Sequence, residues 1–291
     1  MLALLAACVL GIGFVAIKFG LQQMPPFALC AWRYIAASIP LVFFVQRPNI
    51  GWAPLLGYGV AIGVVQFGLL FLALAIGMPA GLSSVVIQFQ AFFTIGLSVW
   101  LVGERVQPAQ LAGAAVAVIG LIVIGWAKVQ GGLGTGFLLV IGAALAWSIG
   151  NLITKKIGRV DPLGFIAWSS LAAPLPLAVL SLLFESPDAL VAPIMHPTWV
   201  IWGSILFTAY GATIFGFGTW SRLLARHDAA VVSPFALLIP VWGMGSTALV
   251  FGERMNAPQA MGAALVIAGL VLGVFGPAWY SALRNRGNRQ S

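Results

Sequence analysis

Charged side chains are scarce in this chain. Only 7% of its 291 residues are Asp, Glu, Lys or Arg, whereas a soluble globular protein carries about 25%. Hydrophobic residues make up 61% of the sequence, and the mean hydropathy is +1.06. A water-soluble protein of this composition would have too few polar side chains to cover its surface. The composition therefore argues against a soluble domain and indicates a membrane protein.

Cysteine, histidine and acidic residues are also rare. The chain has two cysteines, two histidines and six acids. Cys8 and Cys30 fall inside apolar blocks, so the sequence offers neither a disulfide framework nor a metal-ligand spacing. His196 and His227 fall in connections, and no nucleophile is spaced with a base. The sequence thus argues against an enzyme and predicts no cofactor and no metal site.

Long apolar blocks fill most of the sequence. Blocks near 20 residues match the hydrocarbon thickness of a bilayer when they are helical, whereas strands of a membrane barrel are about 10 residues long and alternate. The first block has no basic flank before it, which predicts a retained span and not a cleaved signal peptide. We predict an all-α membrane protein with ten transmembrane helices, at 2–20, 27–46, 54–76, 80–102, 107–126, 135–153, 162–184, 199–222, 229–251 and 257–276.

An internal repeat divides the chain. Gly103-Glu104-Arg105 returns as Gly252-Glu253-Arg254, 149 residues later, and the residues that follow each copy also correspond. We predict a first five-helix repeat at 1–127, a second at 128–276 and a basic cytoplasmic tail at 277–291. Because each unit has an odd number of spans, the second must enter the bilayer the opposite way up. Inverted repeats of this kind are typical of transporters with a substrate site near the midplane.

Basic residues gather in one set of loops. These loops carry Arg47, Arg105, Lys155, Lys156, Arg159, Arg222, Arg226, Arg284, Arg286 and Arg289. The opposite loops carry Lys128 and Arg254, with Lys18 and Arg33 inside span ends on that side. This asymmetry predicts that both termini are cytoplasmic. The net charge of +8 then reflects orientation in the lipid bilayer, and we expect no nucleic-acid partner.

Several motifs resemble those of a known family. They are Leu10-Gly11-Ile12-Gly13-Phe14, Pro25-Pro26, Ala31-Trp32-Arg33-Tyr34, the two Gly-Glu-Arg turns and Leu238-Ile239-Pro240-Val241. Together they resemble the EamA-type transporters of the drug/metabolite transporter superfamily, and most closely the ten-span bacterial amino-acid exporters. The resemblance implies an inner-membrane protein that exports amino acids, including neutral or aromatic ones, and related small metabolites. Where that family commonly has Trp and Pro in the first half, this chain has Leu10 and Ala91.

Polar and aromatic side chains inside the spans are the candidate substrate-binding residues, because such groups face protein or a watery cavity. In the sixth span, Trp147, Asn151 and Thr154 share one helical face, and in the fourth Ser84, Gln88 and Phe92 do so. Amides can bind a carboxylate or an ammonium, and aromatic faces attract an ammonium by about 0.5–2 kcal/mol. Packing or interhelical hydrogen bonding is the alternative for each residue. The candidate set is Phe14, Gln66, Ser84, Gln88, Trp147, Asn151, Tyr210 and Thr213.

Three further residues are candidates for gating. Lys18 and Lys155 correspond in the repeat and fall near opposite faces, where they could guide a carboxylate or line a gate, or else extend to the interface. Pro240 is expected to kink the ninth span because it lacks a backbone donor. We expect Glu104 with Arg105, and Glu253 with Arg254, to form local ion pairs that hold their turns.

No acid falls in the middle of a span, and Asp228, at the entry of the ninth, comes nearest. A proton antiporter that exchanges protons at its substrate site needs a buried carboxylate, so the sequence favours downhill transport by alternating access. A same-fold transporter of drugs, purines or nucleotide-sugars, possibly coupled to protons, stays open as the alternative. A channel is disfavoured because no charged ring or filter-like repeat occurs. The sequence is compatible with a monomer.

Overall fold

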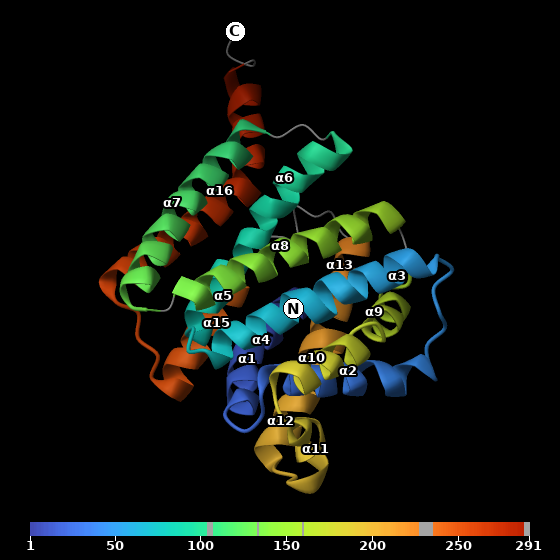
Figure 1. The fold of residues 1–291 in the computed structure, drawn as a ribbon. Helices are drawn as coiled ribbons and strands as arrows, with labels where there is room; N and C mark the ends of the chain where they lie inside the picture. The colour runs from blue at the N-terminus through green and yellow to red at the C-terminus, as the bar shows by residue number, and fades with distance from the viewer. Residues whose placement is uncertain (104–106, 133, 159, 227–234, 288–291) are drawn as a thin grey trace.

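In the computed structural model, the chain folds into packed helices joined by short connections (Figure 1). The structure describes residues 1–103, 107–132, 134–158, 160–226 and 235–287. No strand occurs among them. The helices are α1 (Leu2–Leu21), α2 (Pro26–Val42), α3 (Trp52–Tyr58), η1 (Gly59–Gln66), α4 (Phe67–Ala75), α5 (Ala80–Val86), η2 (Ile87–Phe89), α6 (Gln90–Val102), α7 (Pro108–Gln130), α8 (Gly134–Ile157), α9 (Pro162–Ser170), α10 (Pro174–Phe184), α11 (Pro187–Met195), α12 (Trp199–Leu206), η3 (Phe207–Phe217), α13 (Gly218–Arg226), α15 (Leu238–Phe251) and α16 (Ala257–Gly287).

The prediction of an all-helical membrane protein is confirmed. Within the described residues, eight helical stretches are long and apolar enough to cross a bilayer, and they coincide with eight of the ten predicted spans. The predicted second and ninth spans correspond to shorter apolar helices, α2 with 17 residues and α15 with 14. The start of the ninth span, 229–234, lies outside the described residues.

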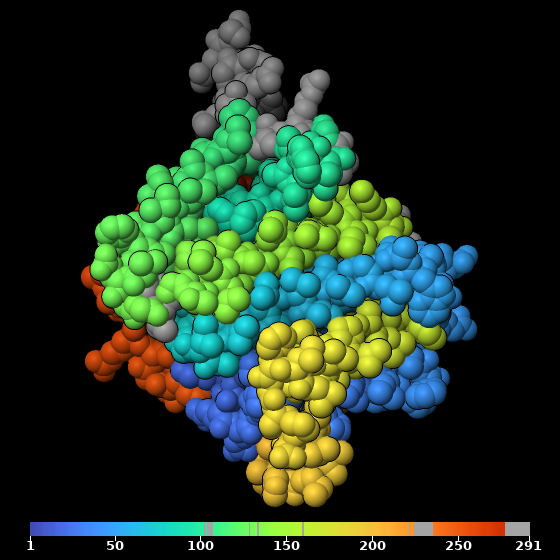
Figure 2. All heavy atoms as spheres, viewed as in Figure 1, coloured from blue at the N-terminus to red at the C-terminus, as the bar shows by residue number. Residues whose placement is uncertain are grey.

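The connection between the predicted seventh and eighth spans, 185–198, contains the short helix α11. Two tryptophans bind its backbone: Trp32 Nε1 donates to the carbonyl of Leu190 at 2.8 Å, and Trp202 Nε1 donates to that of Pro193 at 3.0 Å. The two rings also meet edge to face, 5.8 Å apart. In the space-filling view, α11 and α12 form a protrusion beyond the rest of the molecule (Figure 2).

The glycine of each Gly-Glu-Arg motif ends a helix. Gly103 follows α6 with φ +73° and Gly252 follows α15 with φ +63°. This left-handed conformation is strained for residues with a Cβ and is the usual stop signal of a helix. The expected ion pair between Glu253 and Arg254 is wrong, because the Glu253 carboxylate binds Lys18 and the start of α5 instead. Glu104 and Arg105 lie outside the described residues.

Irregular helical turns occur at corresponding positions of the two halves. The π-helical segment η1 falls within the third span and η3 within the eighth, and the repeat distance of 149 residues maps η1 onto the interior of η3. The fourth span is irregular at η2, which contains Gln88. The described part of the ninth is interrupted near its start at Leu237, 149 residues after Gln88. Wide or broken turns are frequent at functional sites.

A proline explains the interruption at Leu237. Pro240 has no backbone N–H, so the carbonyl of Ala236, four residues earlier, cannot receive the usual helical hydrogen bond. The side chain of Gln88 supplies the missing donor: its Nε2 lies 3.1 Å from that oxygen. Pro240 is buried in the first turn of α15, immediately after the break. Its predicted role in gating stays a prediction.

The last helices of the two halves, α7 and α16, lie side by side (Figure 1). They approach so closely that a Cβ added to Gly113 would stand 2.5 Å from the carbonyl oxygen of Gly269, and one added to Gly120 would stand 2.6 Å from that of Gly262. Gly262 and Gly269 follow Gly113 and Gly120 by 149 residues. The contacts are therefore reciprocal, and the two helices run antiparallel. Small residues permit such close packing in membranes.

Substituting Gly269 with alanine is expected to destabilise the fold by about 1–3 kcal/mol, the usual cost of overpacking. The new Cβ would meet backbone atoms, the Gly113 oxygen at 2.5 Å and the Ala117 nitrogen at 2.7 Å, which cannot turn aside as a side chain can. Thermal unfolding of the purified protein in detergent measures the effect. Gly245→Ala is the matched control because nothing lies within 4 Å of its added Cβ; equal midpoints for both variants would contradict the prediction.

Candidate functional site

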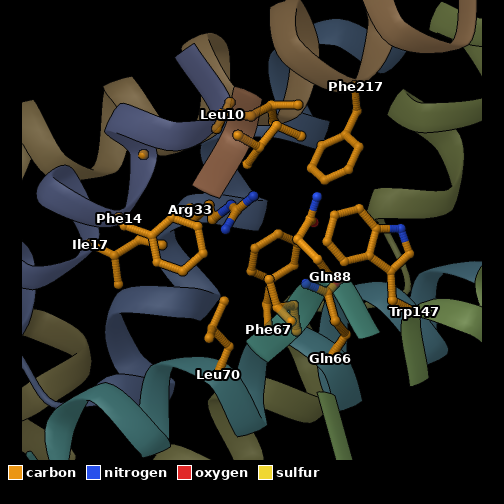
Figure 3. A pocket seen from close by; sticks show the side chains of 14 residues that line it. Leu10, Phe14, Ile17, Arg33, Gln66, Phe67, Leu70, Gln88, Trp147 and Phe217 are labelled. Carbon is orange, nitrogen blue, oxygen red and sulfur yellow. The ribbon is translucent and has the colours of Figure 1, made fainter. Parts of the chain in front are cut away.

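A cavity lies between the inner helices (Figure 3). Helices from both halves of the chain contribute to it, including the irregular turns η1, η2 and η3. The labelled lining residues are Leu10, Phe14, Ile17, Arg33, Gln66, Phe67, Leu70, Gln88, Trp147 and Phe217.

A second, larger cavity continues from the first. Gln88, Trp147 and Phe217 line both, so these three side chains stand between the two spaces. The second cavity extends to Trp220 in the first turn of α13 and to Val274 in α16. Together the cavities lead from the centre of the helices toward one end of the bundle.

Aromatic rings form one wall of the inner cavity. Trp147 meets Phe217 edge to face at 5.7 Å between centroids, and Phe217 meets Phe67 in the same manner at 6.3 Å. Such contacts hold large flat faces in fixed positions. The wall therefore offers an apolar surface and two ring faces against which a ligand side chain can pack.

Arg33 brings a positive charge into this apolar space. The residue lies within α2 and is fully buried. Its Nε and Nη2 donate to Thr213 Oγ1 at 3.1 and 2.9 Å, and its Cζ lies 3.6 Å from the centroid of the Phe67 ring. Its Nη1 has no hydrogen-bond partner among the described residues. The guanidinium is thus held on one edge and free on the other.

Arg33 lines the cavity but was not among the substrate-binding candidates, because it was assigned to a span end. Its position in the sequence could have identified it. The residue lies inside the predicted second span, 27–46, where an ionisable side chain is costly and usually functional.

Two glutamines add further polar atoms to the cavity. Gln66, at the end of η1, is 1% exposed, and Gln88, in η2, is 3% exposed. The Oε1 atom of each lacks a hydrogen-bond partner among the described residues. Of the eight predicted substrate-binding residues, the structure brings four to this cavity: Phe14, Gln66, Gln88 and Trp147.

The other four predicted residues do not line it. Asn151 Nδ2 donates to Gln90 Oε1 at 2.8 Å and to Thr94 Oγ1 at 3.0 Å, so this amide joins α8 to α6. Ser84 donates to the carbonyl of Gly81 at 2.6 Å and packs against Gly243 in α15. Asn151 thus forms the interhelical hydrogen bonds, and Ser84 the packing contact, that the sequence left open as alternatives to substrate binding.

Tyr210 and Thr213 both belong to η3 but take different places. Tyr210 is 39% exposed and lies outside the lining of either cavity described above. Thr213 is buried, and its hydroxyl accepts from Arg33 while donating to the carbonyl of Thr208 at 2.9 Å. Thr213 therefore positions Arg33, and it lines a smaller adjoining cavity.

The inner cavity ends near an ion pair. Lys18 Nζ lies 2.6 Å from Glu253 Oε1 and 4.4 Å from the Phe251 ring centroid, and the neighbouring Ile17 lines the cavity. The Glu253 carboxylate also accepts from the backbone amides of Ala80 at 3.1 Å and Gly81 at 2.9 Å. It thus ties together α1, the start of α5 and the turn after α15. We call this arrangement the Lys18–Glu253 lock.

Opposing effects act on the pKa of Glu253. Partial burial raises it, but the hydrogen bonds from Lys18, Gly81 and Ala80, with the nearby positive charge, together hold the pKa below its ordinary value. The carboxylate therefore stays ionised at neutral and mildly acidic pH. Lys155, the other predicted gating lysine, is exposed near the end of α8.

The four described acids all serve helix N-termini, where the helix dipole favours a negative charge. Glu185 accepts from the amides of Phe27 at 2.6 Å and Ala28 at 3.0 Å, at the start of α2. Asp161 accepts from Gly164 at 2.6 Å and caps α9, and Asp188 falls in the first turn of α11. Glu253 does the same for α5. None of the four lines the cavity; Glu104 and Asp228 lie outside the described residues.

Sequence comparison finds relatives over nearly the whole chain. It is 42% identical over 281 residues to a protein of Salmonella typhimurium strain LT2 named "Probable amino-acid metabolite efflux pump", covering 94% of both chains. A protein of the same name from Escherichia coli K12 is 40% identical over 289 residues, covering 97% of both. "Aromatic amino acid exporter YddG" of Ancylobacter novellus is 27% identical over 265 residues, covering 84% of this chain and 86% of the relative.

Structure and family comparisons agree with this. A solved structure titled "Crystal structure of protein" superposes with a TM-score of 0.66 at 22% identity, covering 94% of this chain and 95% of the other, and so shares the fold. The EamA-like transporter family matches residues 1–126 and 134–275. With the apolar helices, these matches identify the chain as a multi-pass integral membrane protein that belongs to the EamA-like transporter family.

Proposed function

We propose that this protein is a secondary transporter that exports neutral and aromatic amino acids, with related small metabolites, across the bacterial inner membrane. The observation that carries the proposal is the pair of joined cavities, which hold buried polar atoms, lead toward one end of the bundle and end near the Lys18–Glu253 lock at the other. The names of the two most similar relatives reported above support the substrate class. Alternating access follows when the lock opens as the opposite end closes.

The proposal includes ten spans arranged as two inverted repeats, 1–127 and 128–276, with a basic tail at 277–291. The antiparallel, reciprocal contacts of α7 with α16 support the inversion, as do the irregular turns spaced 149 residues apart. Loop charges favour cytoplasmic termini. In that orientation the cavity opens toward the cytoplasm and the lock lies on the outer side, an arrangement suited to loading substrate for export.

Facilitated transport, without proton exchange at the site, is the mechanism that we propose. It is supported by the positions of the described acids, each at a helix N-terminus and none in the cavity. Proton-coupled exchange at the substrate needs a carboxylate that is alternately protonated and bound. The Glu253 carboxylate is already held by three donors, and its pKa is low.

Purified protein in liposomes tests the proposal with labelled neutral amino acids. Phenylalanine and leucine are expected to equilibrate in either direction, and a protonophore is expected to change the initial rate by less than about twofold, because dissipating the gradient removes no driving force. Protein-free liposomes give the background. Accumulation against the substrate gradient that requires a pH difference would contradict facilitated transport, and absence of flux for every amino acid would contradict the substrate class.

A further inference from the structure

We propose that Arg33, Gln66 and Gln88 form a site for the headgroup of a free α-amino acid. Arg33 Nη1 would donate to the carboxylate, and the Oε1 atoms of Gln66 and Gln88 would accept from the ammonium. This inference rests on the proposed function and deepens it, because it states which chemical groups the transporter requires in its substrate.

The first step of the argument is where unpartnered atoms occur. Among the described residues, three buried side-chain nitrogen or oxygen atoms lack a hydrogen-bond partner: Arg33 Nη1, Gln66 Oε1 and Gln88 Oε1. All three residues line the same cavity. Buried polar atoms are nearly always satisfied in folded proteins, so a concentration of exceptions at one place indicates where water or a polar ligand binds. Figure 3 shows these side chains directed among the rings of Phe14, Phe67, Trp147 and Phe217.

The second step concerns charge. Arg33 carries a full positive charge in an apolar cavity, and it forms no ion pair with any of the described carboxylates, which serve helix N-termini elsewhere. A buried charge requires a counterion or a dense set of hydrogen bonds. Thr213 and the Phe67 ring fix the guanidinium, and the free edge offers a planar donor that suits a carboxylate.

The third step concerns the hydrogen-bond acceptors that Gln88 and Gln66 offer to the cavity. The carbonyl oxygen of Ala236 can only accept a hydrogen bond, so the Gln88 amide must turn its Nε2 donor toward that oxygen. The Oε1 of Gln88 therefore faces the cavity. The lack of an N–H at Pro240 is what leaves this carbonyl open. Gln66 adds an amide whose Oε1 has no partner among the described residues and can accept as well. The fixed acceptor of Gln88 suits an ammonium and disfavours a second anion, so the complete set fits a zwitterion better than a simple carboxylate or a simple amine.

The fourth step places the side chain of the substrate. Beyond the headgroup atoms, Trp147 and Phe217 stand at the opening into the larger cavity. Its lining includes no Asp, Glu, Lys, Arg or His among the described residues. A neutral side chain can therefore extend between the two rings without leaving a charge unpaired.

Four related probes test the proposal by calorimetric titration of the purified protein. L-phenylalanine has both charged groups, L-phenylalanine methyl ester lacks the carboxylate charge, 3-phenylpropionate lacks the ammonium, and phenethylamine lacks the carboxylate group. Loss of one charged contact is expected to raise Kd by about 30-fold or more. L-phenylalanine should therefore bind wild type much more tightly than the other three. A methyl ester that binds as tightly as phenylalanine would overturn the proposal.

Variants then assign each group to its partner. Arg33→Met is expected to raise the Kd of phenylalanine by about 30-fold while changing the Kd of the methyl ester by less than about threefold. Gln66→Leu should raise the Kd of phenylalanine while leaving the Kd of 3-phenylpropionate nearly unchanged. Arg33→Lys, which keeps the charge but loses the planar fork, covers the case in which Arg33→Met does not fold. Arg47→Met is the matched control, because Arg47 is exposed and stacks on Trp52.

The outcomes separate this inference from the proposed function. If phenylalanine crosses liposome membranes through the protein and the methyl ester inhibits this flux as strongly as unlabelled phenylalanine does, the headgroup site is wrong and the transporter assignment stands. If no amino acid binds or crosses, both are wrong. If Arg33→Met and Gln66→Leu weaken all four probes equally, these residues maintain the shape of the cavity, water fills their free positions, and the assignment of carboxylate and ammonium is overturned.

Discussion

Glu253→Ala is expected to lower amino-acid flux by at least about tenfold. The carboxylate accepts from Lys18 and from the amides of Ala80 and Gly81, and hydrogen bonds to a charged group each contribute about 1.5–3 kcal/mol. Removing all three destabilises the state in which the Lys18–Glu253 lock is closed. A loss of 1.4 kcal/mol already shifts a two-state equilibrium about tenfold, and a transporter that cannot close one side cannot complete its cycle.

The lock should be insensitive to pH in the physiological range. A carboxyl whose pKa is lowered on folding contributes stability that is fully present above its unfolded pKa, near 4.3 for Glu, and that is lost as the pH falls through the lower folded value. Glu253 is such a group. Flux through the wild type should therefore show no step attributable to Glu253 between about pH 5.5 and 8.

Two measurements distinguish loss of the lock from loss of the fold. Arg254→Ala is the matched control, since the exposed side chain of Arg254 forms no hydrogen bond or ion pair with the described residues. In a background without Cys8 and Cys30, Ile17→Cys should react with an impermeant thiol reagent much faster when Glu253 is alanine. If Glu253→Ala and Arg254→Ala show equal thiol reaction rates and equal flux, the ion pair is structural and not a gate.

Much of the architecture could be predicted because it depends on composition and spacing. Apolar blocks of bilayer length determine the helices, and the repeated Gly-Glu-Arg motif indicates where two of them end, since only glycine readily takes the left-handed stop at Gly103 and Gly252. Polar and aromatic residues inside spans were the candidates for the site, and Gln66, Gln88 and Trp147 line the cavity. Their occurrence within apolar spans supplied these candidates, and helical periodicity grouped those of the fourth and sixth spans.

The sequence candidates and the residues that line the cavity differ for a physical reason. Periodicity states which residues share a face, but not which neighbour that face meets, so Asn151 was grouped with Trp147 although it bonds to Gln90 and Thr94. Arg33 was assigned to a span end because charge usually favours the interface, and its partner Thr213 is 180 residues away. Partners so distant in sequence become visible only when the helices are packed.

Trp147→Ala is expected to reduce flux at low substrate concentration by about 10- to 100-fold. The ring lines both cavities and meets Phe217 at 5.7 Å, so in the proposed mechanism the substrate passes it on entry and packs against it when bound. Losing the buried contact with one aromatic ring costs about 1.5–3 kcal/mol, which corresponds to that factor in affinity. Trp147→Phe keeps the flat apolar surface and should retain most of the flux.

Flux and folded yield must be measured together for Trp147→Ala, because its ring also supports the aromatic wall. Trp126→Ala is the control: Trp126 is 69% exposed, belongs to α7 and lines neither cavity. Gln88→Ala provides a second variant at the same opening, and it additionally frees the carbonyl of Ala236. Both cavity variants should lose flux by a larger factor than they lose monodisperse protein. If both transport phenylalanine at the wild-type rate, this cavity is structural and the substrate crosses elsewhere.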